Sequence, residues 1–226
     1  MQFGLIEMWE SMAALPRAVA ILLIALSIVS LYRLIERLIV FSKARSKSKV
    51  VAPKLTNLLK QGKVQEALNL STKKEYSRSH LARVTAAGIR HFMEGKESNL
   101  SMEEQIETAQ RGTDRASTVF TQEMKKGLST LGTIATTAPF IGLFGTIFGI
   151  INAFRGMALT GSGGIGAVAS GIAEALIATA LGIGVAIIAF WCFNYLNQKI
   201  DVIDGEMSNT SSEIMDYFVQ KEQKGS

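Results

Sequence analysis

The side chain of this 226-residue sequence that stands out for its chemistry is Glu174, a carboxylate within a long apolar segment. From Gly156 to Gln198 the chain holds no other charged residue. An ionised carboxylate near the centre of a membrane helix costs about 2.5 to 3.5 kcal/mol to insert, so such a residue normally belongs to an ion or proton pathway or faces a partner's opposite charge. The alternative is a structural carboxyl group that only hydrogen-bonds Ser or Thr neighbours and holds helices together.

Threonine hydroxyls are a second set of groups that could pass protons, because each hydroxyl both donates and accepts a hydrogen bond. Most threonines in membrane helices bond their own backbone, and we expect this of Thr130, Thr133, Thr136 and Thr137. Thr146 lies at the edge of a glycine stripe, facing a close neighbour, so a structural and a functional role fit it equally well.

Small residues recur along both apolar segments that carry these groups. At residues 128–154 they are spaced three and four apart, which forms a stripe for the close approach of another helix, and Pro139 is expected to bend the helix locally. At residues 165–198 small residues share the face of Glu174, which favours a partner helix or water over lipid, and Thr179 lies about 140° around the helix from Glu174. The small-residue positions are Ala135, Ala138, Gly142, Gly145 and Gly149 in the first segment, and Ala167, Gly171, Ala178, Gly182, Val185 and Ala189 in the second.

The hydropathy pattern predicts an all-α membrane protein with three transmembrane helices. A helix needs about 20 predominantly apolar residues to cross the roughly 30 Å hydrocarbon layer. Two of the helices should extend into the cytoplasm, where the polar middle of the chain should form a small helical bundle. The predicted parts are a periplasmic N-terminus at 1–14, transmembrane helices at 15–41, 128–154 and 165–198, a cytoplasmic helical domain at 42–127, a periplasmic connector at 155–164 and a cytoplasmic tail at 199–226.

Local signals divide the predicted cytoplasmic domain into helices. Gly62 should end the first helix, and Gly95 is expected to stop a later one. Ser101 with Glu104 forms the capping-box pattern that opens another helix. No cluster of Gly or Pro follows, so we expect this helix to continue to Phe154, a length of about 80 Å at about 1.5 Å per residue.

The positive charge of the sequence is concentrated in one segment. Residues 42–127 hold 17 Lys and Arg against 9 Asp and Glu, whereas the tail from Lys199 holds 3 basic and 6 acidic residues. Basic loops normally stay in the cytoplasm, which predicts a periplasmic N-terminus and a cytoplasmic C-terminus. Glu7 and Glu10 replace the basic start of a secretory signal, so we expect an uncleaved first helix. The basic segment is helical and poor in aromatic residues, which favours contact with membrane lipids and predicts no nucleic-acid partner.

The sequence carries no enzyme motif. It contains no phosphate-binding Walker loop, no H-E-x-x-H and no G-x-S-x-G. With a single cysteine, Cys192, and two histidines, His80 and His91, the chain offers no intramolecular disulfide and no set of residues at zinc-ligand spacing, so we expect neither a metal nor another cofactor.

Two stretches resemble the signature segments of the MotA/TolQ/ExbB proton channel family and are most similar to its ExbB and TolQ branch. These stretches are ATTAPFIGLFGTIFGIINAF at residues 135–154 and GIAEALIATALG at residues 171–182. The resemblance is specific over residues 130–195. The rest of the chain is compatible with it in the number of spans, the size of the loop and the predicted orientation.

The resemblance implies a stator subunit of the bacterial inner membrane that conducts protons. In this family five copies form a ring whose second and third spans line a pore, and the pore holds the single spans of two copies of an ExbD- or TolR-like partner. The ring is implied to do mechanical work on a TonB- or TolA-like periplasm-spanning protein. The family's pore threonine falls on Thr146, its third-span glutamate on Glu174 and its third-span threonine on Thr179. The resemblance therefore implies a proton pathway formed by these three residues.

Several alternatives stay open. The system energised is expected to be TonB-dependent import, with Tol-Pal envelope maintenance or gliding motility as alternatives. A non-conducting membrane scaffold would have the same spans but would do no work that depends on a pH gradient. A secondary transporter fits poorly, because three spans are too few and no inverted repeat is visible. Sodium could replace the proton, since hydroxyl and carboxyl oxygens also ligate Na⁺, although the resemblance favours protons.

Overall fold

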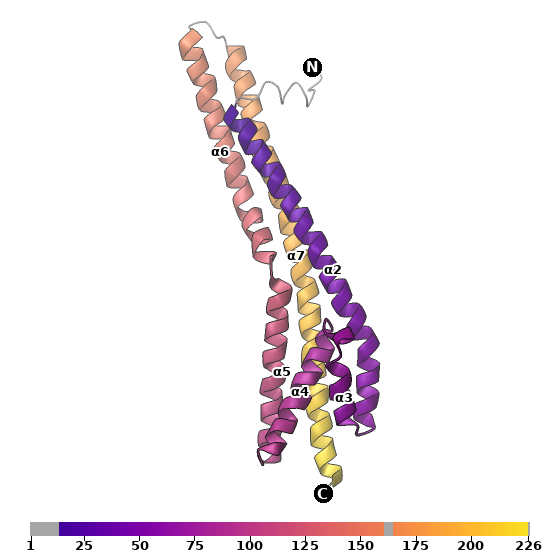
Figure 1. The fold of residues 1–226 in the computed structure, drawn as a ribbon. Helices are drawn as coiled ribbons and strands as arrows, with labels where there is room; N and C mark the ends of the chain where they lie inside the picture. Colours follow the sequence, from indigo (N-terminus) through magenta and orange to yellow (C-terminus); the bar gives the residue numbers. More distant parts are fainter. Residues whose placement is uncertain (1–13, 161–164, 226) are drawn as a thin grey trace. The chain divides into compact units, whose positions relative to one another are not determined.

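The fold is described by a computed structural model that covers residues 14–160 and 165–225 (Figure 1). All regular secondary structure in these two ranges is helical, so the all-α prediction is confirmed. The helices are α2 (Ala14–Lys60), α3 (Val64–Ser71), the short 3-10 helix η1 (Lys74–Tyr76), α4 (His80–Glu97), α5 (Met102–Lys125), α6 (Leu128–Thr160) and α7 (Ile165–Gly225).

Three of these helices are long and apolar enough to cross a membrane, as the sequence predicts. The candidate spans lie within Ala14–Lys60, Leu128–Ala158 and Val168–Lys221. Since α7 has 61 residues, its length is about 90 Å, roughly three times the thickness of the hydrocarbon layer. Much of α7 must therefore lie outside the membrane.

The chain divides into two compact units, and α2 and α7 each contribute to both. The membrane unit comprises residues 14–35, 127–160 and 165–195, which include the apolar parts of α2, α6 and α7. The second unit, called the helical bundle below, comprises Glu36–Lys126 and residues 196–225.

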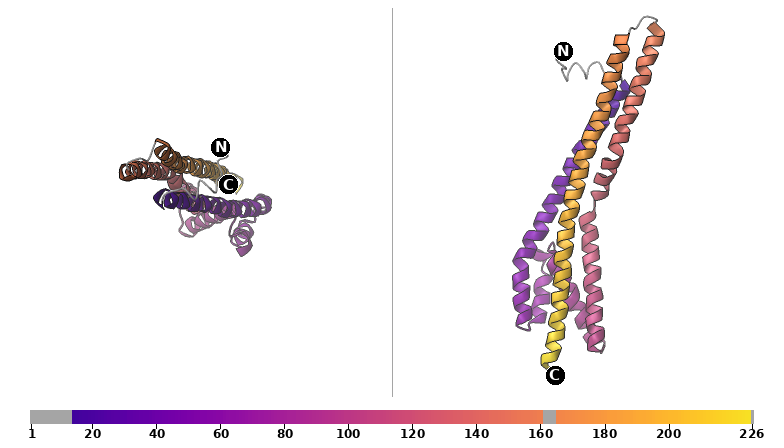
Figure 2. Two further views of the ribbon diagram at one scale, coloured as in Figure 1. Left: turned by 90° about the horizontal axis from the view of Figure 1, so that it is seen from above. Right: turned by 180° about the vertical axis from the view of Figure 1, so that it is seen from behind.

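The core of the membrane unit consists of small and branched side chains. Val19 of α2, Ala138 of α6 and Ala178 of α7 meet there, and Figures 1 and 2 show α6 and α7 side by side in this unit. Large apolar side chains face outward instead, with Phe140 71% exposed and Trp191 70% exposed. Lipid tails solvate such side chains, so helices in a membrane associate through close packing of small residues.

The helical bundle has the opposite arrangement, with large apolar side chains inside. Leu55 of α2, Ile89 of α4, Ala109 of α5 and Phe218 of α7 belong to one buried cluster. The ring of Phe92 on α4 stacks on that of Phe218, with centroids 3.8 Å apart and planes inclined by 7°. Burial of such side chains away from water drives this unit together, as in a soluble protein. The bundle predicted from the apolar periodicity is therefore present.

The C-terminal half of α7 belongs to this bundle, whereas the sequence predicts only a tail at 199–226. Ile203, Met207, Ile214 and Phe218 are all buried in the bundle unit. Their spacing of four, seven and four residues places them on one face of a helix. That spacing is the signal from which a packed helix could have been predicted.

The single helix expected from Ser101 to Phe154 is interrupted, so that prediction is wrong. α5 ends at Lys125 and α6 begins at Leu128. Between them Gly127 adopts φ = +84°, a left-handed conformation that an α-helix does not accommodate and that residues with a side chain rarely adopt. One glycine in this conformation ends a helix without any cluster of Gly or Pro.

Two other glycines differ in their effect on helix ends. Gly62, with φ = +75°, follows the end of α2 at Lys60, as predicted. Gly95 does not stop α4, which continues to Glu97. A Cβ on Gly95 would lie 3.1 Å from Cγ of Gln105, so this glycine serves the close packing of α4 on α5 and does not terminate the helix.

Most of the predicted connector between the second and third spans is helical. α6 continues to Thr160 and α7 begins at Ile165, so Gly156 and Gly166 both lie within helices. Residues 161–164 lie outside the described part of the chain. Helix is the conformation that satisfies backbone N–H and C=O groups internally near a membrane, and this requirement outweighs the low helix propensity of glycine.

The predicted capping box at the start of α5 is confirmed. The N–H of Glu104 donates to Oγ of Ser101 at 3.3 Å, and the N–H of Ser101 donates to Oε2 of Glu104 at 2.8 Å. The hydrogen bonds from Ser101 hold the pKa of the Glu104 carboxyl below its ordinary value.

Replacement of Gly127 by alanine should destabilise the fold, because the left-handed conformation costs an L-residue about 1 to 2 kcal/mol. Space is not limiting there, since an added Cβ would lie 3.6 Å from its nearest neighbour, Cδ of Arg33. The matched control is Gly205→Ala on α7, where an added Cβ has no neighbour within 4 Å. The midpoint of thermal unfolding in detergent should fall for Gly127→Ala and stay equal or rise for Gly205→Ala. Equal effects of the two substitutions would contradict the role assigned to Gly127.

Candidate functional site

The predicted site lies in the membrane unit, where α6 and α7 touch through their backbones. A Cβ on Gly142 would lie 2.6 Å from the carbonyl oxygen of Ala178, and a Cβ on Gly182 would lie 2.6 Å from that of Ala138. Distances this short leave no room for a side chain at either glycine. The close approach brings Cα–H groups of one helix to the carbonyl oxygens of the other. It also determines which side chains of the two helices face each other.

Other small residues continue this contact along both helices. A Cβ on Gly149, and likewise one on Gly171, would lie 2.6 Å from Cβ of an alanine on the opposite helix. On the side of α2, a Cβ on Gly145 would lie 3.0 Å from Cγ1 of Val19. The small-residue stripe of α6 therefore has α7 of the same chain as its close neighbour, and α2 covers part of it.

Thr146 of α6 is buried at this contact and reaches across it. Its Oγ1 lies 2.9 Å from the carbonyl oxygen of Ala175 on α7 and 3.2 Å from that of Gly142 on its own helix. The same oxygen is in hydrogen-bond contact with Oγ1 of Thr179. The structure thus brings together Thr146 and Thr179, which lie 33 residues apart in the sequence.

The hydroxyl of Thr146 has several acceptors but only one proton. When it donates to a carbonyl group, the contact with Thr179 is made by the Thr179 hydroxyl donating to Thr146. Rotation of the Thr146 hydroxyl between Ala175 and Gly142 exchanges a bond between helices for a bond within one helix. The pair can therefore occupy two hydrogen-bonded states without any movement of the backbone.

Glu174 lies at the edge of the same contact, five residues or about one and a half turns from Thr179. Oγ of Ser170 donates to Oε1 of Glu174 at 3.4 Å, which is a long hydrogen bond. The carboxyl group lines a pocket of about 370 Å³ together with Asn152, Ser170, Pro16 and small residues of α6 and α7. Glu174 is thus half-buried beside a mostly apolar pocket with two further polar residues, Asn152 and Ser170, and it is bonded to Ser170 and not to the threonine pair.

Two polar residues of this pocket, Asn152 and Ser170, were not predicted from the sequence. Ser170 precedes Glu174 by four residues on the same helix, a spacing that places two side chains side by side and could have indicated the contact. Asn152 lies on the other helix, and only the packing of α6 on α7 brings it to the pocket. Asn152 follows Gly149 by three residues and so continues the spacing of the stripe, a signal that could have placed it on this face.

The remaining predicted residues have ordinary structural surroundings. Thr133, Thr136 and Thr137 each donate to a carbonyl oxygen of α6, as predicted. Cys192 is buried and unpaired, in agreement with a packing role. Ala135 packs against the core of the membrane unit, and Ala189 of α7 is buried. The helix α6 continues through Pro139. The side chain of Ala167 lies outside the described part of the structure.

This arrangement provides a short polar route within apolar helices. Two hydroxyl groups can each accept a proton while donating another, and a carboxyl group can hold one. No group of His, Cys, Asp and Glu residues that could hold a metal ion occurs in residues 14–160 and 165–225. The proton-pathway and pore-lining roles of these residues stay predictions.

A methyl group at Gly182 should separate α6 from α7, because it would lie 2.6 Å from the carbonyl oxygen of Ala138. We expect Gly182→Ala to cost roughly 1 to 3 kcal/mol, the usual penalty of overpacking. Gly184→Ala, two residues away on the same helix, is the matched control, since no atom lies within 4 Å of an added Cβ there. Thermal unfolding in detergent measures both. The backbone contact is not needed for stability if Gly182→Ala melts no lower than Gly184→Ala.

Comparison with known proteins reveals relatives of this chain. An ExbB of Pseudomonas putida is 44% identical over 94 residues, which cover 42% of this chain and 29% of that protein. An ExbB of Xanthomonas campestris pv. campestris is 36% identical over 124 residues, covering 55% and 48% respectively. The Tol-Pal system protein TolQ of Haemophilus influenzae is 26% identical over 209 residues, covering 92% and 90%. The chain thus spans less than half the length of these two ExbB relatives and most of that TolQ.

The family model of the MotA/TolQ/ExbB proton channel family matches residues 49–209. The match includes α6 with Thr146 and the part of α7 with Glu174 and Thr179. It agrees with the resemblance seen in the sequence and with a membrane channel rather than an enzyme. The chain belongs to the MotA/TolQ/ExbB proton channel family.

Proposed function

We propose that this chain is the channel-forming subunit of an ExbB- or TolQ-type motor, which uses the proton motive force across the inner membrane to do mechanical work. The observation that carries the proposal is the buried hydroxyl of Thr146, which reaches both Ala175 and Thr179 across the contact of α6 with α7. Family membership and the three apolar helices support it. Thr146, Thr179 and Glu174 form the proton pathway in this proposal.

The alternative acceptors of Thr146 suggest how proton movement does work. One charge crossing about 100 mV releases about 2.3 kcal/mol. That energy becomes mechanical only if the arrival of a proton changes a contact between helices. The Thr146 hydroxyl provides such a contact, because it bonds α7 when it donates to Ala175 and α6 when it donates to Gly142. Proton exchange at Thr179 would favour one of these states over the other.

Glu174 holds or tunes the proton next to this pair. Its carboxyl group lies beside the pocket formed with Asn152 and Ser170, which has room for water. Water in that pocket would allow protons to reach the carboxyl group from outside the contact between α6 and α7. A structural carboxyl group that holds helices together would bond Ser or Thr of a second helix. The bond between Glu174 and Ser170 instead lies within α7 and is long, and Glu174 is only half-buried.

We further propose that the chain assembles as a ring of five copies around two single-span partners of the ExbD or TolR type, which act on a TonB- or TolA-like protein. The resemblance supports this stoichiometry. Large apolar side chains on the outside of the membrane unit, such as Phe140 and Trp191, agree with contacts to lipid or to neighbouring copies.

TonB-dependent import is the system that we favour. The relatives from P. putida and X. campestris are named biopolymer transport protein ExbB, although a TolQ of Pseudomonas aeruginosa is also 42% identical over 84 residues. Tol-Pal function is the alternative, because the named TolQ of H. influenzae aligns over nearly the whole chain, although at lower identity. A non-conducting scaffold ring is the alternative from another class. Sodium is the alternative driving ion. It is tested by the proton-uptake measurement described below, repeated with a sodium gradient in place of the pH gradient.

The proposed orientation places the N-terminus in the periplasm and the helical bundle in the cytoplasm, because residues 42–127 hold 17 basic against 9 acidic residues. Single cysteines in a Cys192→Ala background test it. A membrane-impermeant maleimide should label Ser98→Cys only in inverted vesicles and Met157→Cys only in spheroplasts. Labelling on the opposite sides would overturn the orientation.

Removal of the Thr179 hydroxyl should reduce proton flux. In vesicles that contain this chain and its single-span partner, we expect Thr179→Val to lower pH-gradient-driven proton uptake by about tenfold or more, equivalent to about 1.4 kcal/mol in the barrier. Glu174→Gln should also reduce uptake. Thr133→Val is the matched control, since the Thr133 hydroxyl donates to the carbonyl oxygen of Ser129 in its own helix. Undiminished uptake in both Thr179→Val and Glu174→Gln would rule out the proposed pathway.

A further inference from the structure

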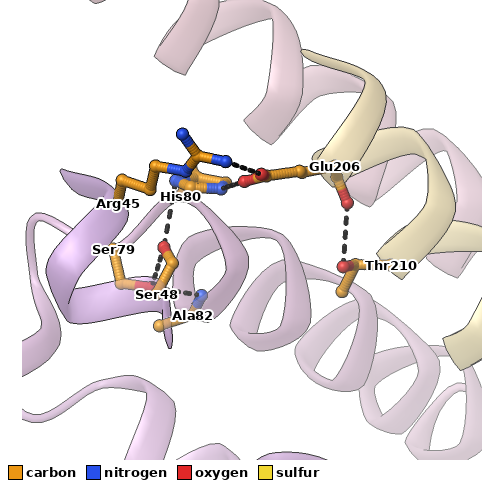
Figure 3. A network of polar contacts seen from close by, with 7 residues as sticks. All are labelled: Arg45, Ser48, Ser79, His80, Ala82, Glu206 and Thr210. Atoms are coloured by element: carbon orange, nitrogen blue, oxygen red, sulfur yellow. Dashed lines mark hydrogen bonds and ion pairs between the residues drawn. The ribbon is translucent and has the colours of Figure 1, made fainter. Parts of the chain in front are cut away.

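A buried polar network in the helical bundle joins three helices around His80 (Figure 3). His80 opens α4 and its side chain is 0% exposed. Its Nε2 lies 2.7 Å from Oε2 of Glu206 on α7, and its Nδ1 lies 2.9 Å from Oγ of Ser48 on α2. Ser48 in turn contacts Oγ of Ser79 at 2.8 Å, and Ser79 caps α4 by accepting from the N–H of Ala82 at 3.1 Å.

Only one direction of donation lets every donor in this network meet an acceptor. Glu206 can only accept when ionised, so Nε2 of His80 carries the proton and donates to it. In the neutral imidazole Nδ1 is then an acceptor, and Ser48 donates to it. Ser79 therefore donates to Ser48 while accepting from Ala82. Every polar group in the chain from Ala82 to Glu206 is satisfied when His80 is neutral.

A second proton on His80 reverses part of this chain. Protonated Nδ1 becomes a donor, so Ser48 must accept from it and donate to Ser79. Ser79 already accepts from Ala82, and its own hydroxyl proton loses the acceptor that it had within the network. Ser48 and Ser79 are buried, at 2% and 0% exposure, so water does not readily replace that acceptor.

The charged groups near His80 come from α2, α4, α5 and α7. Glu206 faces it from α7, and Nη2 of Arg45 on α2 lies 3.9 Å from the other carboxylate oxygen of Glu206. From α5 the ring of Phe120 lies 5.9 Å away, covered by Arg83, which is paired with Glu123. Burial lowers the pKa of His80 below its ordinary value and Arg45 adds to this effect, while Glu206 opposes it.

We propose that the Ser48–His80–Glu206 network is a proton-sensitive latch, which holds the start of α4 against α2 and α7 when His80 is neutral and loosens when His80 takes up a proton. The sign follows from linkage. An unfolded or opened chain binds a proton at His80 near the ordinary value of about 6.5, and the closed network resists it, so the closed state loses stability as pH falls through that value. The latch goes beyond the proposed channel function and does not depend on it.

Hydrogen–deuterium exchange of the full-length protein in detergent tests the latch. The measured quantity is the protection factor of the amides in residues 80–86, which already corrects for the intrinsic effect of pH on exchange. Between about pH 7.5 and about pH 5.5, a range in which histidine is the side chain that normally titrates, we expect this factor to fall about tenfold. Residues 102–108 at the start of α5 serve as an internal reference and should not change.

The two histidines of the chain provide a matched pair of variants. His80→Gln keeps a donor for Glu206 but cannot take up a proton, so the pH dependence should disappear. His91→Gln should retain it, because His91 is bonded to Glu94 on its own helix and packs against Gly112 of α5, away from the Ser48–His80–Glu206 network. Retention of the pH dependence in His80→Gln, or its absence in the wild type, would overturn the proposal.

Glu206→Gln provides an independent measure if His80→Gln does not fold. The glutamine still accepts from Nε2, but the negative charge that favours imidazolium is gone. The closed network therefore resists the proton still more strongly, and the loss of protection between about pH 7.5 and about pH 5.5 should be at least as large as in the wild type. A smaller loss than in the wild type would contradict the latch.

Discussion

The backbone contact between Gly142 of α6 and Gly182 of α7 is the constraint on which the proposed site depends. Each glycine occupies a place where a Cβ would lie 2.6 Å from a carbonyl oxygen of the opposite helix. Only at this separation does the Thr146 hydroxyl reach both Ala175 and Thr179. A larger side chain at either glycine would move the helices apart and leave these hydroxyls to bond their own backbones, as Thr133 does.

The chain combines two kinds of packing that follow from two solvents. In the membrane unit small residues lie inside and Phe140 and Trp191 face outward, because lipid offers no hydrophobic reason to bury them. In the helical bundle Phe120 and Phe218 are buried, which is the arrangement that an aqueous environment favours. α2 and α7 pass from one kind of packing to the other within a single helix. Their average composition therefore says little about their environment, and only the local pattern of large and small residues does.

Much of the fold and part of the site could be predicted from the sequence. Long apolar segments define the three spans. The spacing of Gly142, Gly145 and Gly149 predicts a close helix contact, because membrane helices associate through small residues spaced three and four apart. The break at Gly127 was missed because the conformation of one glycine depends on its tertiary surroundings. The His80 network was also missed, because Ser48, His80 and Glu206 lie on three helices and no periodicity links them.

The central claim is that Thr146, Thr179 and Glu174 carry protons inside an assembled ring. A density map of the purified assembly in lipid, at a resolution that shows side chains and ordered water, tests it most directly. The claim predicts that these three residues face a central cavity that contains water and a helix of a different protein. A dry axis without a foreign helix, with Glu174 directed at acyl chains, would contradict it.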